Sequence, residues 1–424
     1  MLYEEARVYL DHVSKYGSVL GLESIKSLLG ELANPQNDLK FIHIAGTNGK
    51  GSILAELSEI LTSAGYRVGR YCSPTVLDYL ERFQIDGLEM KKEDYARLTE
   101  QVKQAAERGM QKGGRQQTAF EIETAIAFLY FKEKRCDYVV LETGLGGKED
   151  ATNVIEHPLL SVFASISMDH MACLGNTLEE IALQKAGIIK PGAAVVTGPQ
   201  SECVMEVLEK TAHEKGCICY LAEPVKVRKS DWNGQAFLWK GKTYFLPLLG
   251  RFQLENVAVV LQAVECLRTY GIEIPDAAIK EGLSRVQWPG RFQALRYGDT
   301  KIILDGAHNA QAALRLKENI EAYLTGQEIV AITGIFRDKD YGSMVQTLAP
   351  HFSYVYTIDL PNRERTLHRQ QLQKAWKDAG VSAESVDNIS KALELAIKRA
   401  GERGVVLVCG SLSYLGEVLR ILQA

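Results

Sequence analysis

The stretch FIHIAGTNGKGS, residues 41–52, decides the fold class of this chain. An apolar run typical of a buried strand ends in a glycine-rich loop, and apolar residues then recur at helical spacing up to Gly65. In such a strand–loop–helix unit, backbone amides and the helix N-terminus favour phosphate oxygens, while Lys50 can reach terminal phosphates and the Ser52 hydroxyl can hold magnesium. The sequence therefore predicts a phosphate-binding loop whose natural ligand is ATP.

The spacing of this loop departs from the usual G-x-x-x-x-G-K-S/T pattern. Gly46 lies only three residues before Gly49, and Gly51 separates Lys50 from Ser52. By spacing alone, an ordinary glycine-rich turn between a strand and a helix is an alternative. The strand pattern before the loop and the helical pattern after it favour nucleotide binding, which could serve a kinase, a GTPase or a ligase.

The composition is that of a soluble globular protein. The 424 residues are 46% hydrophobic and 24% charged, and the net charge of −4 gives no basic footprint for nucleic acid. The N-terminal MLYEEARVYLDHV has no apolar core of signal length, and no later segment approaches a membrane-spanning run. We expect a cytoplasmic monomer with neither nucleic-acid nor membrane partners. The eight cysteines show no C-x-x-C pair and are expected to be reduced core residues.

Alternating strand and helix patterns predict an α/β fold with a P-loop ATPase-type, doubly wound, mostly parallel sheet. Its strands after the loop are expected at 137–144, 159–167 and 193–199. A small β-rich excursion is expected between residues 217 and 248, with a hairpin turning near Gly241, before a helix from about Gln253 to Tyr270.

The second half repeats the alternation and predicts a smaller C-terminal Rossmann-like domain. Its strands are TKIILDGAH, EIVAITGIF, SYVYTIDL and GVVLVCGS, with helices near 310–324, 367–378 and 389–400. A hinge in VQWPGRFQALRYGD gives two expected domains: residues 1–294, which contain the predicted ATP-binding loop, and residues 295–424.

Polar residues that follow predicted parallel strands are the candidates for chemistry, because open α/β sheets bind ligands at the carboxyl ends of their strands. Glu142, His170 (with Asp169 beside it) and Ser73 each follow such a strand. A carboxylate could hold magnesium, whereas a histidine is an unusual ligand for that ion, so a structural role for His170 stays open.

Two further elements carry polar candidates with equally open alternatives. Lys185 lies in a helical pattern, where most lysines extend to solvent. In DGAHNAQA, Asp305, His308 and Asn309 follow a strand in the second domain, and Asn309 could serve only as a helix cap.

The chain resembles the folylpolyglutamate synthase and dihydrofolate synthase family of the ATP-dependent Mur ligase superfamily through an ordered series of motifs. They are HIAGTNGKGS at 43–52, SP with ERFQIDG at 73–87, LETGLGGKEDATN at 141–153, ISMDHMACLGNT at 166–177, KAGIIKPG at 185–192, GRFQLENVAVVLQAVE at 250–265, PGRFQ at 289–293, DGAHNAQA at 305–312, DKD at 338–340 and GSLSYLGEV at 410–418. This combination is far more specific than the phosphate loop alone.

The resemblance implies an ATP and Mg²⁺ site. The implied nucleotide-binding residues are Gly46, Thr47, Asn48, Gly49, Lys50, Gly51, Ser52, Gln253, Asn256, Arg291 and Asp305. The implied metal-site residues are Ser52, Ser73, Glu142, His170 and Lys185. The matching lysine is carbamylated in the family, so Lys185 would join the metal site as an anion.

In the second domain the resemblance assigns Asp305 and His308 to closure over the nucleotide and the incoming glutamate, and it makes a glutamate-pocket role plausible for Ser411 and Tyr414. The implied catalytic residues are Lys50, Glu142, His170, Lys185, Asp305 and His308. The chain departs from the family at Thr75, Phe252 and Lys148, where histidine, histidine and arginine are frequent.

The implied reaction is ADP-forming ligation of L-glutamate to a folate or to dihydropteroate through an acyl phosphate. A Mur-type ligase for another carboxylate, or a non-enzymatic nucleotide-binding protein on the same scaffold, are the alternatives.

Overall fold

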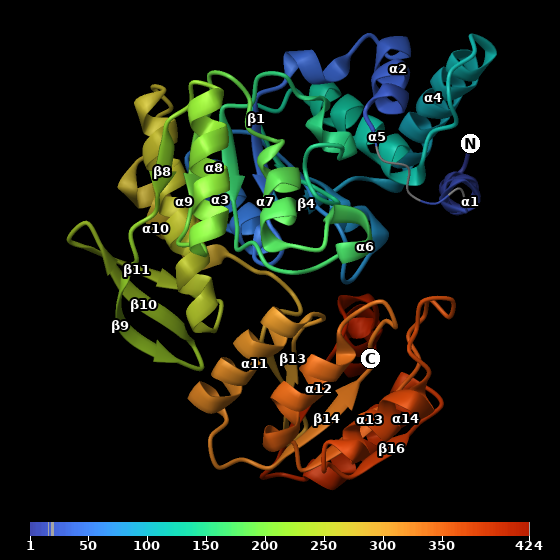
Figure 1. Cartoon of the computed structure of the whole chain (residues 1–424), viewed down its shortest axis with the longest axis vertical. Coiled ribbons are helices and arrows are strands. Elements are labelled where there is room, and N and C mark those ends of the chain that lie inside the picture. The colour runs from blue at the N-terminus through green and yellow to red at the C-terminus, as the bar shows by residue number, and fades with distance from the viewer. Residues whose placement is uncertain (16, 18–20, 424) are drawn as a thin grey trace. The chain divides into compact units, whose positions relative to one another are not determined.

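The computed structural model describes residues 1–15, 17 and 21–423, and the chain forms two compact units (Figure 1). Unit 1 comprises Met1–Ser73, Leu80–Pro224 and Glu255–Arg285. Unit 2 comprises Pro74–Tyr79, Val225–Leu254 and Val286–Ala424. The chain therefore passes from one unit to the other five times.

This division differs from the expected domains 1–294 and 295–424 in two respects. The last passage lies between Arg285 and Val286, because residues 293–297 form a strand of the second sheet and cannot be divided at residue 294. The β-rich excursion, Val225–Leu254, groups with unit 2 rather than with the ATP-binding unit.

Unit 1 is built on an eight-stranded sheet in the order β4-β3-β2-β5-β1-β6-β7-β8. Its pairs are parallel except for β2–β3 and β3–β4, so the predicted mostly parallel sheet is confirmed. Its strands are β1 (Phe41–Ala45), β2 (Val68–Tyr71), β3 (Phe83–Ile85), β4 (Leu88–Glu89), β5 (Tyr138–Glu142), β6 (Leu160–Phe163), β7 (Ala194–Thr197) and β8 (Cys219–Leu221).

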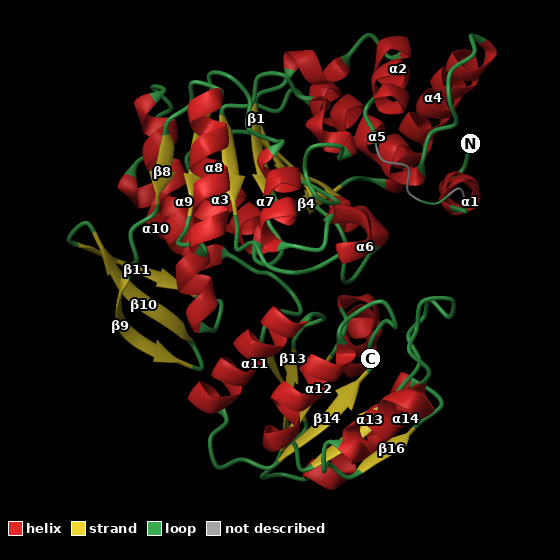
Figure 2. Cartoon of the chain, viewed as in Figure 1, coloured by secondary structure: helices red, strands yellow, loops and turns green. Residues whose placement is uncertain are grey.

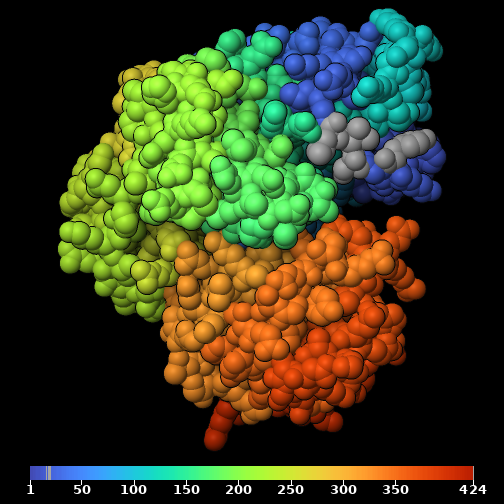
Figure 3. All heavy atoms as spheres, viewed as in Figure 1, coloured from blue at the N-terminus to red at the C-terminus, as the bar shows by residue number. Residues whose placement is uncertain are grey.

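Helices flank this sheet or pack beside it, and α7 and α8 lie in front of it in Figure 2. They are α1 (Tyr3–Ser14), α2 (Glu23–Glu31), α3 (Lys50–Ser63), α4 (Lys92–Gln111), α5 (Ala119–Glu133), α6 (Met171–Leu174), α7 (Leu178–Ala186), α8 (Glu202–Glu214), α9 (Arg251–Thr269) and α10 (Asp276–Arg285), with 3₁₀ turns η1 (Pro35–Asp38), η2 (Tyr79–Arg82) and η3 (Ala151–Val154). The predicted helix from Gln253 to Tyr270 is thus α9, whose first residues belong to the unit 2 stretch. Side chains fill the space between the ribbons, and those of α8 form part of the visible surface (Figure 3).

The winding of the unit 1 sheet reverses between β1 and β6. From β1 the chain proceeds to β2 on one side of the sheet, and from β6 it proceeds to β7 on the other. A crevice outside the carboxyl ends of two such strands is the usual ligand site of a doubly wound sheet. The phosphate loop, residues 46–49, follows β1 directly and therefore lies at this point.

Unit 2 contains a six-stranded sheet in the order β12-β13-β17-β14-β15-β16, parallel except for the β12–β13 hairpin. Its strands are β12 (Gln293–Tyr297), β13 (Thr300–Leu304), β14 (Ile329–Thr333), β15 (Tyr354–Thr357), β16 (Ala383–Ser385) and β17 (Val405–Cys409). Its helices are α11 (Ala310–Tyr323), α12 (Tyr341–Leu348), α13 (Arg369–Asp378), α14 (Ile389–Ala400) and α15 (Leu415–Gln423), with 3₁₀ turns η4 (Ala349–His351) and η5 (Leu412–Tyr414). The Rossmann-like second fold is confirmed.

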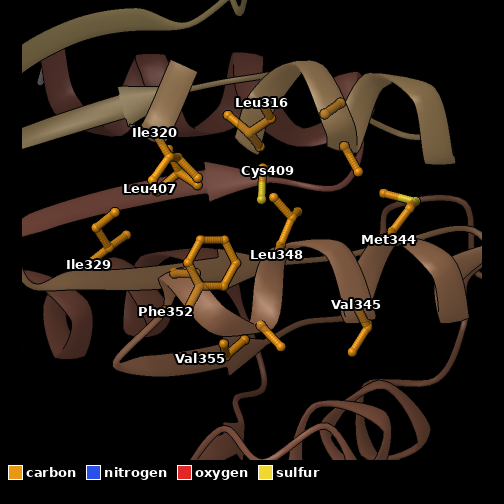
Figure 4. Close-up of a cluster of buried hydrophobic side chains, with 14 of the residues drawn as sticks. Leu316, Ile320, Ile329, Met344, Val345, Leu348, Phe352, Val355, Leu407 and Cys409 are labelled. Atoms are coloured by element: carbon orange, nitrogen blue, oxygen red, sulfur yellow. The ribbon is translucent and has the colours of Figure 1, made fainter. Parts of the chain in front are cut away.

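The core of unit 2 on one face of its sheet joins strand and helix side chains that are distant in sequence. Leu316 and Ile320 of α11 lie near Leu407 of β17, and Leu348 and Phe352 complete the cluster shown in Figure 4. Burial of such aliphatic and aromatic side chains contributes roughly 1.5–3 kcal/mol each. Ile303 of β13 belongs to the same cluster, so this packing holds β13 and the start of the loop that follows it in place.

The β-rich excursion forms a separate three-stranded antiparallel sheet of β9 (Lys226–Asp231), β10 (Gly234–Trp239) and β11 (Lys242–Leu246). The predicted hairpin is β10–β11, which turns at Lys240 and Gly241. The basic run 226–230 is exposed on β9, as expected of a solvated face.

All eight cysteines are free thiols, but the expectation that they are core residues holds fully for only four of them. Cys72, Cys136, Cys266 and Cys409 are buried, Cys203, Cys217 and Cys219 are partly buried, and Cys173 is exposed. Within the described ranges, no helix combines the length and apolar character needed to cross a membrane.

Candidate functional site

Glycines shape the phosphate loop because no other residue fits at two of its positions. Gly46 has φ +151°, and a Cβ atom there would lie 2.7 Å from the Ala164 Cβ of the segment after β6. Gly49 has φ +95°, and a Cβ atom there would lie 2.5 Å from Oδ1 of Asn256. The loop backbone therefore packs directly against Ala164 and Asn256. This close packing explains why the glycines stand at positions 46 and 49 rather than at the usual spacing.

Hydrogen bonds tie the loop to the segment that follows β6. The amides of Thr47 and Asn48 both donate to the Ser165 carbonyl, at 2.7 and 3.2 Å. The Thr47 hydroxyl donates to the Ser167 carbonyl at 3.0 Å and accepts from the Ser167 amide at 3.0 Å. The Thr47 and Asn48 amides are therefore used within the protein.

The first turn of α3 supplies the amides that remain. Gly49 is the N-cap residue, and the helix begins at Lys50. The first N–H groups of any helix lack a carbonyl partner in that helix and carry the positive end of its dipole. The amides of Lys50, Gly51 and Ser52, rather than those of Thr47 and Asn48, are therefore the donors that could face an anion.

Lys50, Glu142 and Ser73 come from three neighbouring segments and meet at this edge of the sheet. The Lys50 ammonium lies 3.6 Å from the Glu142 carboxylate and donates to the Thr47 carbonyl at 3.4 Å. The other Glu142 oxygen accepts from the Ser73 amide at 3.4 Å. The Glu142 side chain is only 6% exposed, so it presents a nearly desolvated anion beside the loop.

Lys185 is the third charged group at the loop. It lies on α7, is buried, and donates from Nζ to the Gly46 carbonyl at 2.8 Å. Burial, and then the nearby charge of Lys50, lower the pKa of Lys185 to about 7, whereas Asp169 and Asp150 oppose this shift. The expectation that most helical lysines extend to solvent does not hold here, and an amine with this pKa is partly neutral near neutral pH.

His170 takes a less direct position. It has φ +50° and precedes α6, and its ring Nε2 lies 3.9 Å from Oδ1 of Asp169 while its amide donates to the same carboxylate at 2.8 Å. Its side chain is 40% exposed. In the part of the chain that the structure describes, no three His, Cys, Asp or Glu side chains gather as a metal cage.

The available donors nevertheless suit magnesium. Mg²⁺ prefers oxygen, keeps several waters and is commonly held by one or two carboxylates together with substrate phosphates. Glu142 supplies a buried carboxylate, and two serines offer hydroxyls: Ser52 in the first turn of α3, and Ser73, whose amide donates to Glu142. The donor set fits this ion better than one that requires an all-protein cage.

The sequence did not predict a series of buried side-chain hydrogen bonds that supports the site. The Asp150 carboxylate accepts from the Leu145 amide at 2.7 Å and from the Thr152 hydroxyl at 2.5 Å. The Thr152 hydroxyl oxygen in turn lies 2.8 Å from His43 Nε2 on β1. These contacts order the loop after β5 against β1, and the only hint in the sequence is the DATN motif itself.

In unit 2, the buried Asp305 carboxylate orders two loops. Its oxygens accept from the Phe292 amide at 2.9 Å and from the Ala307 amide at 2.8 Å. Burial raises the pKa of Asp305 to about 6, although these hydrogen bonds and the charge of Arg291 oppose the shift. Asp305 and Arg291 thus lie close enough for their charges to interact.

His308 and Asn309 complete the turn before α11. The His308 ring contacts the Gly306 carbonyl through Nδ1 at 2.8 Å, so Nδ1 carries the proton and a neutral ring keeps its lone pair on Nε2. Asn309 caps α11 by accepting from the Ala312 amide at 2.9 Å, which confirms the capping alternative.

The remaining candidates are buried. Gln253 and Asn256 lie on α9, one on either side of the boundary between the units. The hydroxyl of Tyr414 contacts the carbonyls of Cys409 and Ile332 at 2.6 and 3.1 Å, which makes it a core residue rather than part of a glutamate pocket. Ser411 caps η5.

The reversal of the sheet winding, the glycine loop and the Lys50–Glu142 pair are features of a nucleotide-binding α/β fold, and the family matches identify this fold as that of a ligase. Residues 44–264 match the family described as Mur ligase middle domain, and residues 290–412 match the Mur ligase glutamate ligase domain.

The closer relatives narrow this class. The chain is 34% identical to the dihydrofolate synthase/folylpolyglutamate synthase of Bacillus subtilis, over 99% of both chains, and 32% identical to the folylpolyglutamate synthase of Lacticaseibacillus casei, over 89% of this chain and 92% of that one. Its structure matches that of Mycobacterium tuberculosis folylpolyglutamate synthase complexed with ADP and AMPPCP at a TM-score of 0.91 and 26% identity, over 100% and 99% of the two chains. The chain belongs to the folylpolyglutamate synthase/dihydrofolate synthase family.

Proposed function

We propose that this protein is an ATP-dependent ligase that joins L-glutamate to a folate or to dihydropteroate, releasing ADP and phosphate. The observation that carries the proposal is the buried Lys50–Glu142 pair at the phosphate loop, in a chain of this family. The Mycobacterium tuberculosis relative is complexed with ADP, and an Escherichia coli relative at 30% identity with DHPP and ADP.

The phosphate loop would bind the polyphosphate of ATP. The amides of Lys50, Gly51 and Ser52 and the Lys50 ammonium provide the positive potential, and Gly46 and Gly49 let the backbone approach. Lys50 is within reach of either Glu142 or an incoming phosphate oxygen. Gln253, Asn256 and Arg291 are proposed to contact the rest of the nucleotide.

Glu142, Ser52 and Ser73 would hold Mg²⁺, with His170 as a further ligand. Bound there, the ion would neutralise charge on the transferring phosphoryl group. The Ser73 amide and Lys50 meanwhile fix the Glu142 carboxylate.

Lys185 is proposed to be carbamylated. Only a neutral amine reacts with carbon dioxide, and burial beside Lys50 favours that form. The resulting anion would compensate the positive charge of Lys50 within the site. Intact-mass measurement in bicarbonate buffer would detect this modification, and an unmodified lysine under those conditions would contradict it.

The chemistry requires activation, because oxide is a very poor leaving group from a carboxylate. The γ-phosphoryl group of ATP is transferred to the carboxylate oxygen, giving an acyl phosphate and ADP. The glutamate amine then attacks the carbonyl carbon, inorganic phosphate leaves, and the nitrogen loses a proton to form the amide. Asp305 and His308 would help to bind the amino acid and the nucleotide.

One experiment tests this function. The protein is incubated with ATP, Mg²⁺ and glutamate, with dihydropteroate or a reduced folate supplied separately, and products are followed by mass. Glutamate addition to either substrate supports the proposal, and addition to both identifies a bifunctional enzyme. ATP binding without substrate-dependent phosphate release would instead support a nucleotide-binding protein, and ligation of another carboxylate alone would support a different Mur-type ligase.

A further inference from the structure

The segment Pro74–Tyr79 belongs to a different unit from the residues on both sides of it. Met1–Ser73 and Leu80–Pro224 are parts of unit 1, whereas these six residues belong to unit 2. The segment starts at the peptide bond after Ser73, whose amide donates to the Glu142 carboxylate. A short piece of unit 2 is therefore covalently continuous with the proposed phosphate and metal site.

Helix α15 anchors the middle of this segment in two ways. Nη2 of Arg420 donates to the Leu77 carbonyl at 3.0 Å. Gly416 lies against the Val76 carbonyl so closely that a Cβ atom at this position would overlap the oxygen. The Val76 and Leu77 side chains also pack against the unit 2 hydrophobic cluster that contains Leu415 and Leu419.

Unit 1 holds the two ends of the same stretch. Before the segment, the Cys72 amide donates a hydrogen bond to the Arg82 carbonyl at 3.3 Å, and the Ser73 amide donates one to the Glu142 carboxylate. After it, the buried side chains of Arg82 and Glu123 form an ion pair. The segment is thus held at both ends in unit 1 and in its middle on α15, and it is only six residues long.

Pro74 makes the link to Ser73 stiff. Its ring fixes its own φ, and a residue that precedes proline is confined to extended conformations. A displacement of the segment is therefore transmitted to the Ser73 peptide rather than absorbed by free rotation. The Ser73 amide donates to one oxygen of Glu142, so the displacement reaches the carboxylate that faces Lys50.

We propose that α15 positions Ser73 and Glu142 through the segment Pro74–Tyr79, so that Gly416 and Arg420 are positioning residues for the Mg²⁺–nucleotide site although neither lies in it. The inference rests on the proposed function in assigning Mg²⁺ and nucleotide to Glu142 and Ser73. It adds a coupling between the units: the contacts that α15 of unit 2 makes with the segment affect the positions of Ser73 and Glu142 in unit 1.

The test compares Arg420→Ala with Arg403→Ala, an exposed arginine of the same unit, in the full chain. Amide hydrogen exchange is measured on peptides that cover Ser73 and the segment, and Mg²⁺–ADP affinity is measured by calorimetry. We expect Arg420→Ala to accelerate exchange at Ser73 and residues 75–79 by about tenfold, the factor that one ordinary hydrogen bond contributes. We also expect weaker Mg²⁺–ADP binding at unchanged melting temperature, with Arg403→Ala like the parent protein.

Gly416→Ala and Arg420→Lys sharpen the result. Gly416→Ala should reproduce the faster exchange because its methyl group displaces Val76, whereas Arg420→Lys retains a donor and should restore much of the protection. Unchanged exchange at Ser73 in Arg420→Ala and Gly416→Ala would overturn the anchoring. Faster exchange with parental Mg²⁺–ADP affinity would overturn the coupling.

Failure of the proposed function has a different signature. If the parent protein binds Mg²⁺–ADP but adds glutamate to neither folate substrate, the ligase assignment fails. The coupling still stands in that case if Arg420→Ala accelerates exchange at Ser73 and weakens the nucleotide complex.

Discussion

The ammonium of Lys50 lies 3.6 Å from the carboxylate of Glu142, and both groups are largely buried. The pair joins the first residue of α3 to the last residue of β5. Helix α3 follows β1, and the sheet order places β1 beside β5. Each partner keeps the other oriented, so removal of one leaves a buried charge without compensation.

Lys50→Ala should abolish measurable glutamate ligation while leaving the fold intact. Loss of one preorganised charge at a phosphoryl-transfer site commonly lowers kcat by about 10²–10³-fold, and here the Glu142 carboxylate also loses its counter-charge. Steady-state phosphate release and near-ultraviolet circular dichroism measure the two effects. Lys91→Ala, an exposed substitution in the same unit, is the control; near-normal turnover by the Lys50 variant would refute the phosphate assignment.

The effect of backbone strain can be separated from the effect of a clash in the loop by comparing Gly49→Ala with Gly65→Ala. The two glycines flank α3 and have similar positive φ angles, +95° and +91°. Both variants should lose about 1–2 kcal/mol of stability from the left-handed conformation. Only Gly49→Ala brings its methyl group against Asn256, since nothing lies within 4 Å of a Cβ atom at Gly65. We expect weaker ADP binding in Gly49→Ala alone, and equal affinity in both variants would contradict the steric account.

His43 should make stability fall in acid. The Thr152 hydroxyl donates to Asp150, so His43 Nε2 must donate to Thr152, and among the described residues its buried Nδ1 has no hydrogen-bond partner. Burial lowers the pKa of His43 from 6.5 to about 3. As pH falls, His43 is therefore protonated in the unfolded chain before it is protonated in the folded protein. The contribution of neutral His43 to the free energy of unfolding is complete above pH 6.5, and it is lost toward pH 3 by roughly 1.4 kcal/mol for each pH unit.

Urea denaturation across this range, with His43→Gln for comparison, measures the effect. The glutamine amide can donate to Thr152 but does not titrate, so the variant should lack the His43 part of the acid slope. Identical slopes in the two proteins would show that His43 is not held neutral.

Asp305 should have the opposite effect on stability: its contribution to the free energy of unfolding should fall as pH rises, over part of the pH range in which His43 titrates. Its pKa is raised from 3.8 to about 6, so the folded state binds the proton first. Its stabilising contribution is present below pH 3.8 and is lost as pH rises through 6. Asp305→Asn should remove this decline and cost about 1–3 kcal/mol, because an amide cannot accept from both the Phe292 and Ala307 amides.

Asp299→Asn, on the exposed turn before β13, is the matched control for this variant and should retain the parental slope. Denaturation midpoints at pH values on either side of 6 decide the matter. A parental slope in Asp305→Asn would assign the titration to another carboxyl group.

The fold could be predicted in outline because its signals are local. The strand–loop–helix pattern at 41–61 and the apolar runs of the parallel strands depend on neighbouring residues, and β5, β6, β7, β14 and β17 all lie within their predicted stretches. The unit boundaries could not be predicted in the same way. Strand β12 lies in a Pro/Gly-containing stretch that suggests a hinge, and only its pairing with β13 reveals its unit.

The site was predictable in its residue types but not in its contacts. The loop pattern indicated Lys50 and Ser52, and strand ends indicated Glu142 and Ser73, because parallel strands bring their carboxyl ends to one edge. Burial of Lys185 against the Gly46 carbonyl depends on the packing of α7, which no local pattern encodes. The hydrogen bonds from the Thr47 and Asn48 amides to the Ser165 carbonyl also depend on tertiary structure.

The distribution of unit 1 over three sequence stretches has a consequence for synthesis on the ribosome. Helix α10 completes the surroundings of α3 so tightly that a Cβ atom at Gly282 would lie 2.6 Å from the Ile60 backbone. A nascent chain that has emerged only through β8 therefore exposes the apolar side of α3 during translation of the whole β9–β11 sheet. Translation of this protein should consequently expose it to chaperones or to aggregation until residue 285 has left the ribosome, and the N-terminal half cannot fold to completion first.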